Sequence, residues 1–140
     1  IKLQNITIHQ ELQADLPSFL GDPQLLQQVI FDMVSNSRWA IHKKSTEQDK
    51  NGLIRIRTAY EPETRKVCLY IADNGIGIPQ ENIPKIFDPF FTTKPVGEGT
   101  GLGLSIVYGI IKEHKGSIEV ESNMGEGTTF KISLPVAENV

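Results

Sequence analysis

The sequence predicts an α+β domain that forms a two-layer α/β sandwich: a mixed, mostly antiparallel sheet covered on one face by helices. Several segments alternate apolar and polar residues, which is typical of strands with one buried face and one solvent-exposed face. Another segment is apolar throughout, and two longer stretches repeat apolar residues at helical spacing. Strands of this kind need a helical layer to bury their apolar face, so the two long helices should lie together on one side of the sheet.

Composition is consistent with one soluble-type domain and excludes several classes of function. The 140 residues suit a single core, and the apolar share of 39% with 22% charged residues is ordinary. Lys and Arg number 14 against 17 Asp and Glu, and a net charge of −3 argues against a nucleic-acid partner. The single cysteine, Cys68, excludes an internal disulfide and a cysteine-rich metal site. No apolar run approaches the roughly eighteen residues that a membrane span requires.

The first third of the chain predicts a strand followed by a long helix. Residues 1–8 alternate loosely and read as a strand, and residues 9–22 as a short strand and a loop. Asp22 and Pro23 predict the helix start, with Asp as N-cap and Pro at the first helical position. The helix should run to about His42, because apolar residues recur at helical spacing: Leu26, Val29, Ile30, Met33, Val34, Ala40 and Ile41.

The remaining elements follow a polar loop at residues 43–52. Period-two alternation predicts strands around 54–56, 118–120 and 130–134, and the wholly apolar segment 67–72 should be a central strand. A second long helix is expected over 101–115, ending at Gly116 as a C-cap residue.

The segment DNGIGIP, residues 73–79, directly follows the apolar strand. A carboxylate at that place is costly unless it meets donors, and Asp73 would suit a flat donor such as an adenine amine. Gly75 and Gly77 allow a sharp turn and the close approach of a ligand. A strand-ending Asx turn explains the residues equally well, so the segment alone leaves turn and site open.

Asp32 and Asn36 are four residues apart on the first helix and so share one face beside its apolar stripe. A carboxylate and an amide oxygen one turn apart can bind a hard cation such as Mg²⁺. For an isolated pair, two exposed polar residues are the commoner explanation.

Residues 88–105, DPFFTTKPVGEGTGLGLS, place four glycines before or at the start of the second helix: Gly97, Gly99, Gly101 and Gly103. The first-turn amides of a helix have no intrahelical partners, and with the helix dipole they form an anion site. Lys94 can add a positive charge. A flexible linker is the alternative, but Leu102 and Leu104 among the glycines argue against a solvated linker.

The segment GEGTTF, residues 125–130, reads as a hairpin turn into the last strand. Thr128 could donate and accept hydrogen bonds near a purine ring, although a plain turn accounts for the same residues.

In this order, DMVSNSRWA, DNGIGIP, IFDPFFTTK, GEGTGLGLS and GEGTTF resemble the N box, first glycine box, F box, second glycine box and final glycine–threonine box of histidine kinase catalytic domains. This ATP-binding (HATPase, GHKL) superfamily includes gyrase, a heat-shock chaperone and mismatch-repair ATPases. The resemblance covers nearly the whole chain, and PFFTTKPVGEGTGLGLS is most like sensor kinases of the nitrogen-regulation type. It implies a Bergerat-type fold over residues 1–140.

The resemblance also implies a site for ATP (or ADP) with Mg²⁺. Asn36 would coordinate the metal, and Asp73 would accept from the adenine amine with support from Thr128. Lys94 would reach the γ-phosphate from a mobile ATP lid at about 88–100, and without nucleotide residues 92–100 should be poorly ordered while Gly101–Ser105 are already helical. The remaining expected contacts either line the adenine pocket or place amides near the phosphates: Gly75, Gly77, Ile78, Ile86, Phe130, Gly99, Thr100, Gly101, Leu102, Gly103 and Leu104.

Two departures from the family pattern leave roles open. Where the family often has Asn, this chain has Asp32, so this residue could hold a metal-bound water or act as a base. Trp39 occupies the position three residues after the metal-binding Asn, where many sensor kinases have a cation. Three cations are therefore candidates to contact the phosphates: Lys94 is expected first, then Arg38, then Lys43.

No histidine of this chain matches the phosphoacceptor motif of the family, and His9, His42 and His114 read as surface or capping residues. A dimerisation domain carrying the acceptor histidine is thus expected N-terminal to residue 1. The catalytic domain would be monomeric and cytoplasmic, in a sensor kinase whose other regions could anchor it to a membrane, and a response-regulator aspartate would receive the phosphate. The alternatives are a hydrolytic ATPase or serine-kinase module of the same superfamily, and a nucleotide-binding interaction module without turnover.

Overall fold

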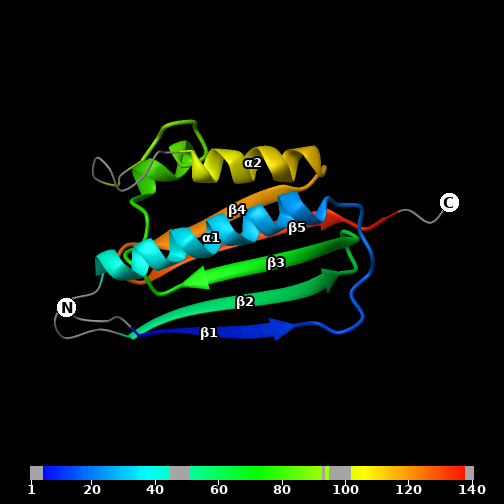
Figure 1. Cartoon of the computed structure of the whole chain (residues 1–140), viewed down its shortest axis with the longest axis horizontal. Coiled ribbons are helices and arrows are strands. Elements are labelled where there is room, and N and C mark those ends of the chain that lie inside the picture. The colour runs from blue at the N-terminus through cyan, green and yellow to red at the C-terminus, as the bar shows by residue number, and fades with distance from the viewer. Residues whose placement is uncertain (1–4, 45–50, 93, 95–101, 138–140) are drawn as a thin grey trace.

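The fold is a single five-stranded sheet with both long helices on one of its faces (Figure 1). The computed structural model describes residues 5–44, 51–92, 94 and 102–137. In chain order the elements are β1 (Asn5–Leu12), α1 (Pro23–Lys44), β2 (Asn51–Glu61), β3 (Lys66–Asp73), the short 3-10 helix η1 (Gln80–Lys85), α2 (Gly103–Glu113), β4 (Ser117–Asn123) and β5 (Gly127–Pro135). Within the described ranges no helix is long and apolar enough to cross a membrane.

The sheet is mixed, and its strand order is β1-β2-β3-β5-β4. β1 pairs with β2 in parallel, and the other three pairings are antiparallel. β3 therefore lies in the middle, as its unbroken apolar sequence predicts. Because β3 and β5 are neighbours, the register places Asp73 directly beside Thr128 at one end of the sheet.

Local signals decide where α1 begins. The Asp22 carboxylate Oδ1 accepts hydrogen bonds from the backbone N–H groups of Gln24 at 2.9 Å and Leu25 at 3.3 Å, so Asp22 is the N-cap and Pro23 opens the helix. The helix continues two residues beyond the predicted end, to Lys44, with basic residues in its last turn that suit the helix dipole.

The end of α2 corrects the predicted C-cap. His114 is the cap, and the left-handed residue after it is Lys115, with φ of 61°, rather than Gly116. The N–H of Gly116 donates to Ile111 O and that of Lys115 to Lys112 O, both at 2.9 Å, which is the Schellman pattern. Gly116 is required for another reason: a side chain there would collide with the Ser133 carbonyl of β5.

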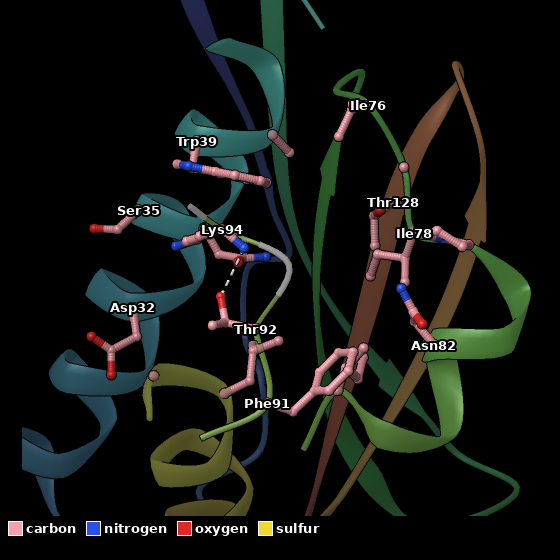
Figure 2. A pocket seen from close by; sticks show the side chains of 17 residues that line it. Asp32, Ser35, Trp39, Ile76, Ile78, Asn82, Phe91, Thr92, Lys94 and Thr128 are labelled. Carbon is pink, nitrogen blue, oxygen red and sulfur yellow. Dashed lines mark hydrogen bonds between the residues drawn. The ribbon is translucent and has the colours of Figure 1, made fainter. Parts of the chain in front are cut away.

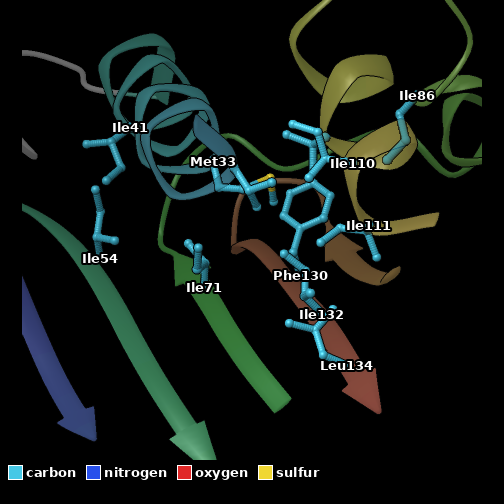
Figure 3. Packing of buried hydrophobic residues seen from close by; sticks show 12 residues of the cluster. Met33, Ile41, Ile54, Ile71, Ile86, Ile110, Ile111, Phe130, Ile132 and Leu134 are labelled. Atoms are coloured by element: carbon cyan, nitrogen blue, oxygen red, sulfur yellow. The ribbon is translucent and has the colours of Figure 1, made fainter. Parts of the chain in front are cut away.

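The core lies between the helices and the sheet (Figure 3). α1 contributes Val29, Met33 and Ile41, and the facing side chains of the strands and of α2 close around them. Phe130 is 1% exposed and lies in the core beside Met33 and Ile110 (Figure 3). This packing fixes the faces that α1 and α2 turn toward each other, where the candidate site is found.

Among the described residues, no helix covers the opposite face of the sheet (Figure 1). Charged and aromatic side chains lie on that face. The Arg57 guanidinium lies 3.9 Å from the centre of the Tyr70 ring, and Lys131 Nζ pairs with Glu61 Oε2 at 2.6 Å. The hydrogen bond from Lys131 lowers the pKa of Glu61, and the same bond raises the pKa of Lys131. These contacts join β2, β3 and β5 across the uncovered face.

Candidate nucleotide site

A cavity of about 370 Å³ opens between α1, the segment after β3 and the start of α2, which is within the size range of small-molecule sites (Figure 2). Its wall combines polar and apolar side chains, and both kinds come from α1 and from the other elements. The lining residues are Asp32, Ser35, Asn36, Trp39, Ala40, Ile76, Gly77, Ile78, Pro79, Asn82, Ile86, Phe91, Thr92, Lys94, Gly103, Leu104 and Thr128.

The α1 wall supplies oxygen ligands. Asp32 and Asn36 both line the cavity, one helical turn apart, as their spacing predicts. Asp32 Oδ1 accepts a hydrogen bond from Gln28 Nε2 at 2.8 Å, which holds the carboxylate from the preceding turn. Figure 2 shows Asp32, Ser35 and Trp39 on the same helix, across the cavity from Thr128 and Ile78.

Backbone hydrogen bonds fix the segment after β3 to three other elements. Ile76 N–H donates to Ala40 O of α1 at 3.0 Å, and Ile76 O accepts from Gly125 N–H of the β4–β5 turn at 2.8 Å. The Asn74 side chain accepts from Leu53 N–H of β2 at 2.8 Å. The segment is thus held on α1, on β2 and on the last hairpin, which positions its backbone along the cavity.

Two glycines are needed where this segment turns. A Cβ at Gly75 would lie 2.6 Å from the backbone carbonyl carbon of Ala40, so only glycine lets the segment approach α1 this closely. Gly77 has φ of 83° and lies against the backbone of Asn123, so a side chain would be both strained and blocked. Gly77 lines the cavity, whereas Gly75 lies behind the wall, against α1.

Asp73 is 8% exposed at the end of β3. Its Oδ1 accepts from Gly75 N–H at 2.8 Å, while Oδ2 is buried and has no hydrogen-bond partner among the described residues. Burial raises the pKa of Asp73, and the hydrogen bond from Gly75 N–H partly opposes that shift. A buried carboxylate oxygen without a donor is the kind of group that a ligand N–H would satisfy.

Thr128, beside Asp73, belongs to a small hydroxyl network. Ser122 Oγ donates to Gly127 O at 3.0 Å and accepts from Ile78 N–H at 2.7 Å. Since the single Ser122 proton goes to Gly127, the 2.8 Å contact with Thr128 Oγ1 makes Thr128 the donor. Thr128 therefore keeps its acceptor lone pairs, and its side chain lines the cavity.

At the other end, α2 begins on the cavity wall with Gly103 and Leu104. Its N-cap is Leu102, which makes no side-chain cap hydrogen bond. The first-turn N–H groups of α2 are consequently not capped by the N-cap side chain, and they lie at the end of the cavity where an anion would be favoured. A Cβ at Gly103 would meet nothing within 4 Å in the described structure, so the glycine leaves open space at this point.

Of the three candidate cations, only Lys94 lines the cavity. Lys94 Nζ lies 5.2 Å from the centre of the Trp39 ring, and Lys94 N–H donates to Thr92 Oγ1 at 3.0 Å. Lys43 Nζ lies 5.7 Å from the same ring without reaching the cavity wall, and Arg38 is not on the wall either. Trp39 itself is thus part of the cavity wall.

The structure brings together most of the predicted site residues that it describes. Asp73, Gly75, Leu102 and Phe130 are not on the wall: Asp73 and Gly75 lie behind the segment after β3, Leu102 caps α2, and Phe130 belongs to the core. Of the predicted lid, residues 93 and 95–100 lie outside the described residues, so Gly99 and Thr100 are not described, and neither is Gly101. The helical start predicted for Gly101–Ser105 is found from Gly103 onward.

Several wall and network residues were not predicted as individual site residues, namely Ser35, Ala40, Ile76, Pro79, Asn82, Phe91, Thr92 and Ser122. Ser35 could have been found, since it directly precedes Asn36 on the polar side of α1. Ser122 could not, because its role depends on the pairing of β4 with β5.

A Mg²⁺ ion fits the donors present, although they form no protein cage. The described residues contain no group of three or more His, Cys, Asp and Glu side chains that could hold a metal. Asn36 and Asp32 offer two oxygen ligands, and Mg²⁺ commonly binds one or two protein oxygens together with phosphates and waters.

The comparisons with known proteins agree with this geometry. Residues 21–138 match the family described as "Histidine kinase-, DNA gyrase B-, and HSP90-like ATPase". The sensor protein RprX of Bacteroides fragilis (strain YCH46) is 37% identical over 143 aligned positions, covering 99% of this chain and 26% of RprX. The sensor kinase CckA of Brucella abortus (strain 2308) is 60% identical over 74 residues, covering 53% of this chain and 8% of CckA. The chain thus spans about a quarter or less of these relatives.

Among solved structures, the catalytic domain of the histidine kinase ThkA in a nucleotide-free form superimposes with a TM-score of 0.76 at 34% identity. The match covers 94% of this chain and 80% of that one. It confirms the predicted two-layer fold, with its mixed sheet covered on one face by helices. Together with the family match over 21–138, it shows that the chain belongs to the histidine kinase-, DNA gyrase B- and HSP90-like ATPases.

Proposed function

We propose that this chain is the ATP-binding catalytic domain of a two-component sensor histidine kinase. It binds Mg-ATP in the cavity beside α1 and transfers the γ-phosphate to a histidine on a separate dimerisation domain. A response-regulator aspartate then takes the phosphate. The relatives are named as sensor proteins and sensor kinases, and this chain corresponds to a limited part of each.

The observation that carries the proposal is the arrangement of the two cavity ends. One end has Thr128 with free acceptor lone pairs, next to the buried Asp73 carboxylate whose Oδ2 lacks a donor. The other end has oxygen ligands from α1, the ammonium of Lys94 and the start of α2. An adenine amine suits the first set and a triphosphate suits the second, so one cavity can hold both parts of ATP.

Adenine binding would rest on Asp73 and Thr128, with apolar contacts from Ile78 and Ile86. The amine of adenine would donate to the Asp73 carboxylate and so supply the missing partner of a buried charge. Asp73 does not line the cavity itself, so the amine would have to reach it next to Thr128, its partner in the β3–β5 register. Gly75 and Gly77 would act by shaping the segment that frames the base.

Phosphate binding would rest on α1, α2 and Lys94. Asn36 is the proposed metal ligand, with Asp32 holding a metal-bound water, and Mg²⁺ supplies charge neutralisation to the triphosphate when bound. The first-turn amides of α2 at Gly103 and Leu104 would approach the phosphate oxygens, and we expect Gly99, Thr100, Gly101 and Leu102 to extend that contact. Lys94 would stabilise the charge that develops during transfer.

Transfer to a histidine is tested with the chain, Mg-ATP and the dimerisation domain of its parent protein. Phosphohistidine should form on the added domain, and Asn36→Ala should lower its rate about a hundredfold or more, since positioning and charge stabilisation provide most of the catalysis in phosphoryl transfer. Asn5→Ala, an exposed amide on the edge strand β1, is the matched control and should react like wild type. If Asn36→Ala transfers phosphate as fast as wild type, the metal role is wrong.

A second candidate is ATP hydrolysis or serine phosphorylation by the same site. The position of Asp32 on the cavity wall favours it, because a carboxylate near the phosphates could activate a water or a hydroxyl. Phosphate release without any acceptor, abolished by Asp32→Asn, would support hydrolysis. Tight ATP binding without transfer or hydrolysis would instead favour a nucleotide-dependent interaction module.

A further inference from the structure

We propose that Trp39 is a positioning residue that holds the ammonium of Lys94 at the phosphate end of the cavity. This inference rests on the proposed binding of ATP and adds to it the residue that places the phosphate-binding cation. Trp39 stands where many sensor kinases have a cation, so this chain would supply the charge from a different segment and support it with an aromatic ring.

The geometry brings the two side chains together at the cavity. Lys94 Nζ lies 5.2 Å from the centre of the Trp39 ring, within the range at which an ammonium is attracted to an indole face. Both residues line the cavity, and Figure 2 shows the Lys94 side chain directly beneath the indole of Trp39. Trp39 follows Asn36 by three residues, so the ring stands on the same face of α1 as the proposed metal ligand.

An aromatic partner suits this position for a physical reason. Lysine carries its charge on a flexible four-carbon stem, and ordering that stem costs conformational entropy when a phosphate is bound. A ring that already holds the ammonium removes part of this cost. A carboxylate partner would hold Lys94 more tightly but would also neutralise the charge and repel the phosphates.

A second ammonium on the same ring provides an internal comparison. Lys43 Nζ lies 5.7 Å from the ring centre, yet Lys43 is on the last turns of α1 and does not line the cavity. If Trp39 acts through Lys94, removing the Lys43 charge should matter little for nucleotide binding. If any charge over the ring were sufficient, the two lysines would behave alike.

The experiment measures ATP and AMP affinity by calorimetry for wild type, Trp39→Leu, Lys94→Met and the double variant. We expect Trp39→Leu to weaken ATP binding about threefold to thirtyfold, the range that a cation–π contact spans. AMP binding should stay within about twofold of wild type, because the adenine end is unaffected. In the Lys94→Met background, Trp39→Leu should cause no further loss. Trp39→Phe should keep most of the ATP affinity, and Lys43→Met should resemble wild type.

The fluorescence of the single tryptophan gives a readout that does not depend on activity. ATP should change the emission of Trp39 in wild type as the phosphates approach the ammonium held over the ring, whereas AMP should not. In Lys94→Met the response to ATP should be largely lost.

Several results would overturn the inference. One is an equal loss of ATP and AMP affinity in Trp39→Leu. Another is a loss of ATP affinity on Trp39→Leu that is just as large in the Lys94→Met protein. Either result would mean that Trp39 only packs against its neighbours. If Trp39→Leu fails to fold, Trp39→Phe can be compared in the wild-type and Lys94→Met proteins instead. An effect of Trp39→Phe on ATP affinity that is equal in both proteins would again overturn the inference. If wild type binds no ATP at all, the proposed function fails first, and calorimetry separates that outcome from the others.

Discussion

The backbone N–H of Asp22 donates to Nε2 of His114 at 3.0 Å, across 92 residues of sequence. The other ring nitrogen, Nδ1, is 2.8 Å from Ile110 O and must carry the proton, because a carbonyl only accepts. The neutral imidazole therefore connects the start of α1 to the end of α2. This contact fixes the two helices that form opposite sides of the cavity.

Replacing this histidine should loosen the connection between the helices. We expect His114→Phe, which keeps a ring but lacks the acceptor, to lower the free energy of unfolding by about 1 kcal/mol, as for one lost hydrogen bond near the surface. His42→Phe, on the exposed side of α1, is the control and should change stability by about half of that or less. Urea unfolding of both variants measures the difference, and equal values would mean that the Asp22 contact contributes nothing.

Asp73 should lower the stability of the ligand-free protein at neutral pH. Its pKa is raised by burial, so the folded protein holds the proton to a higher pH than the unfolded chain, whose aspartate ionises near pH 3.9. Stability is consequently lost as the pH rises from that value through the folded-state pKa. Asp73→Asn should therefore raise the melting temperature at pH 7, and the difference from wild type should vanish below about pH 3.

The same variant should lose nucleotide affinity, because an amide in place of the carboxylate removes the charged acceptor for the adenine amine. The expected weakening of ADP binding is about tenfold to a hundredfold, the cost of a hydrogen bond to a charged group. Thermal unfolding as a function of pH measures the change in stability, and calorimetry with ADP measures the change in affinity. A lower melting temperature for Asp73→Asn at pH 7 would show that the carboxylate stabilises the fold.

Gly103→Ala should separate binding from stability. A Cβ there meets no described atom within 4 Å, so the fold should tolerate it and gain up to about 0.5 kcal/mol. The added methyl group would lie on the cavity wall beside the first turn of α2 and should weaken ATP binding about tenfold, since it hinders approach of the phosphates.

Gly109→Ala is the matched control on the same helix. A Cβ at Gly109 also meets no described atom within 4 Å, but this glycine is inside α2 and away from the cavity. The change should stabilise the protein by about 0.5–1 kcal/mol and leave ATP affinity unchanged. If both variants weaken ATP binding equally, the start of α2 has no special role.

Lys115→Gly should stabilise the protein. Lys115 has φ of 61° at the end of α2, a conformation that glycine adopts without the steric cost that a side chain brings. We expect a gain of about 0.5–1 kcal/mol in the free energy of unfolding. Lys112→Gly, inside the same helix, should instead lose about 1 kcal/mol, and chemical denaturation distinguishes the two signs.

Local signals account for the parts of the fold that the sequence predicts well. Asp22 and Pro23 mark the start of α1 because capping depends only on neighbouring residues, and the apolar run in β3 marks the central strand, which has a paired strand on each side. η1 was not predicted, since six residues with an internal proline, Pro84, carry no helical periodicity.

The site is predictable only where a motif fixes a residue in its own segment. Asp32 and Asn36 follow from helical spacing, and Gly77 from the need for a turn with positive φ. The location of Trp39 on the cavity wall depends on how α1 packs against the rest of the domain, which its sequence spacing leaves undecided. Phe130, expected beside the adenine, is covered by Met33 and Ile110 and belongs to the core.

The uncovered face of the sheet has a consequence for the architecture of any larger protein that contains this domain. Its charged groups already have partners, with Arg57 over the Tyr70 ring and Lys131 paired with Glu61, so docking a third layer there would strip water from groups that are already satisfied. The two faces of the domain therefore differ. Residues on the uncovered face of the sheet can change without disturbing the cavity, and we expect neighbouring domains to dock on the helical side.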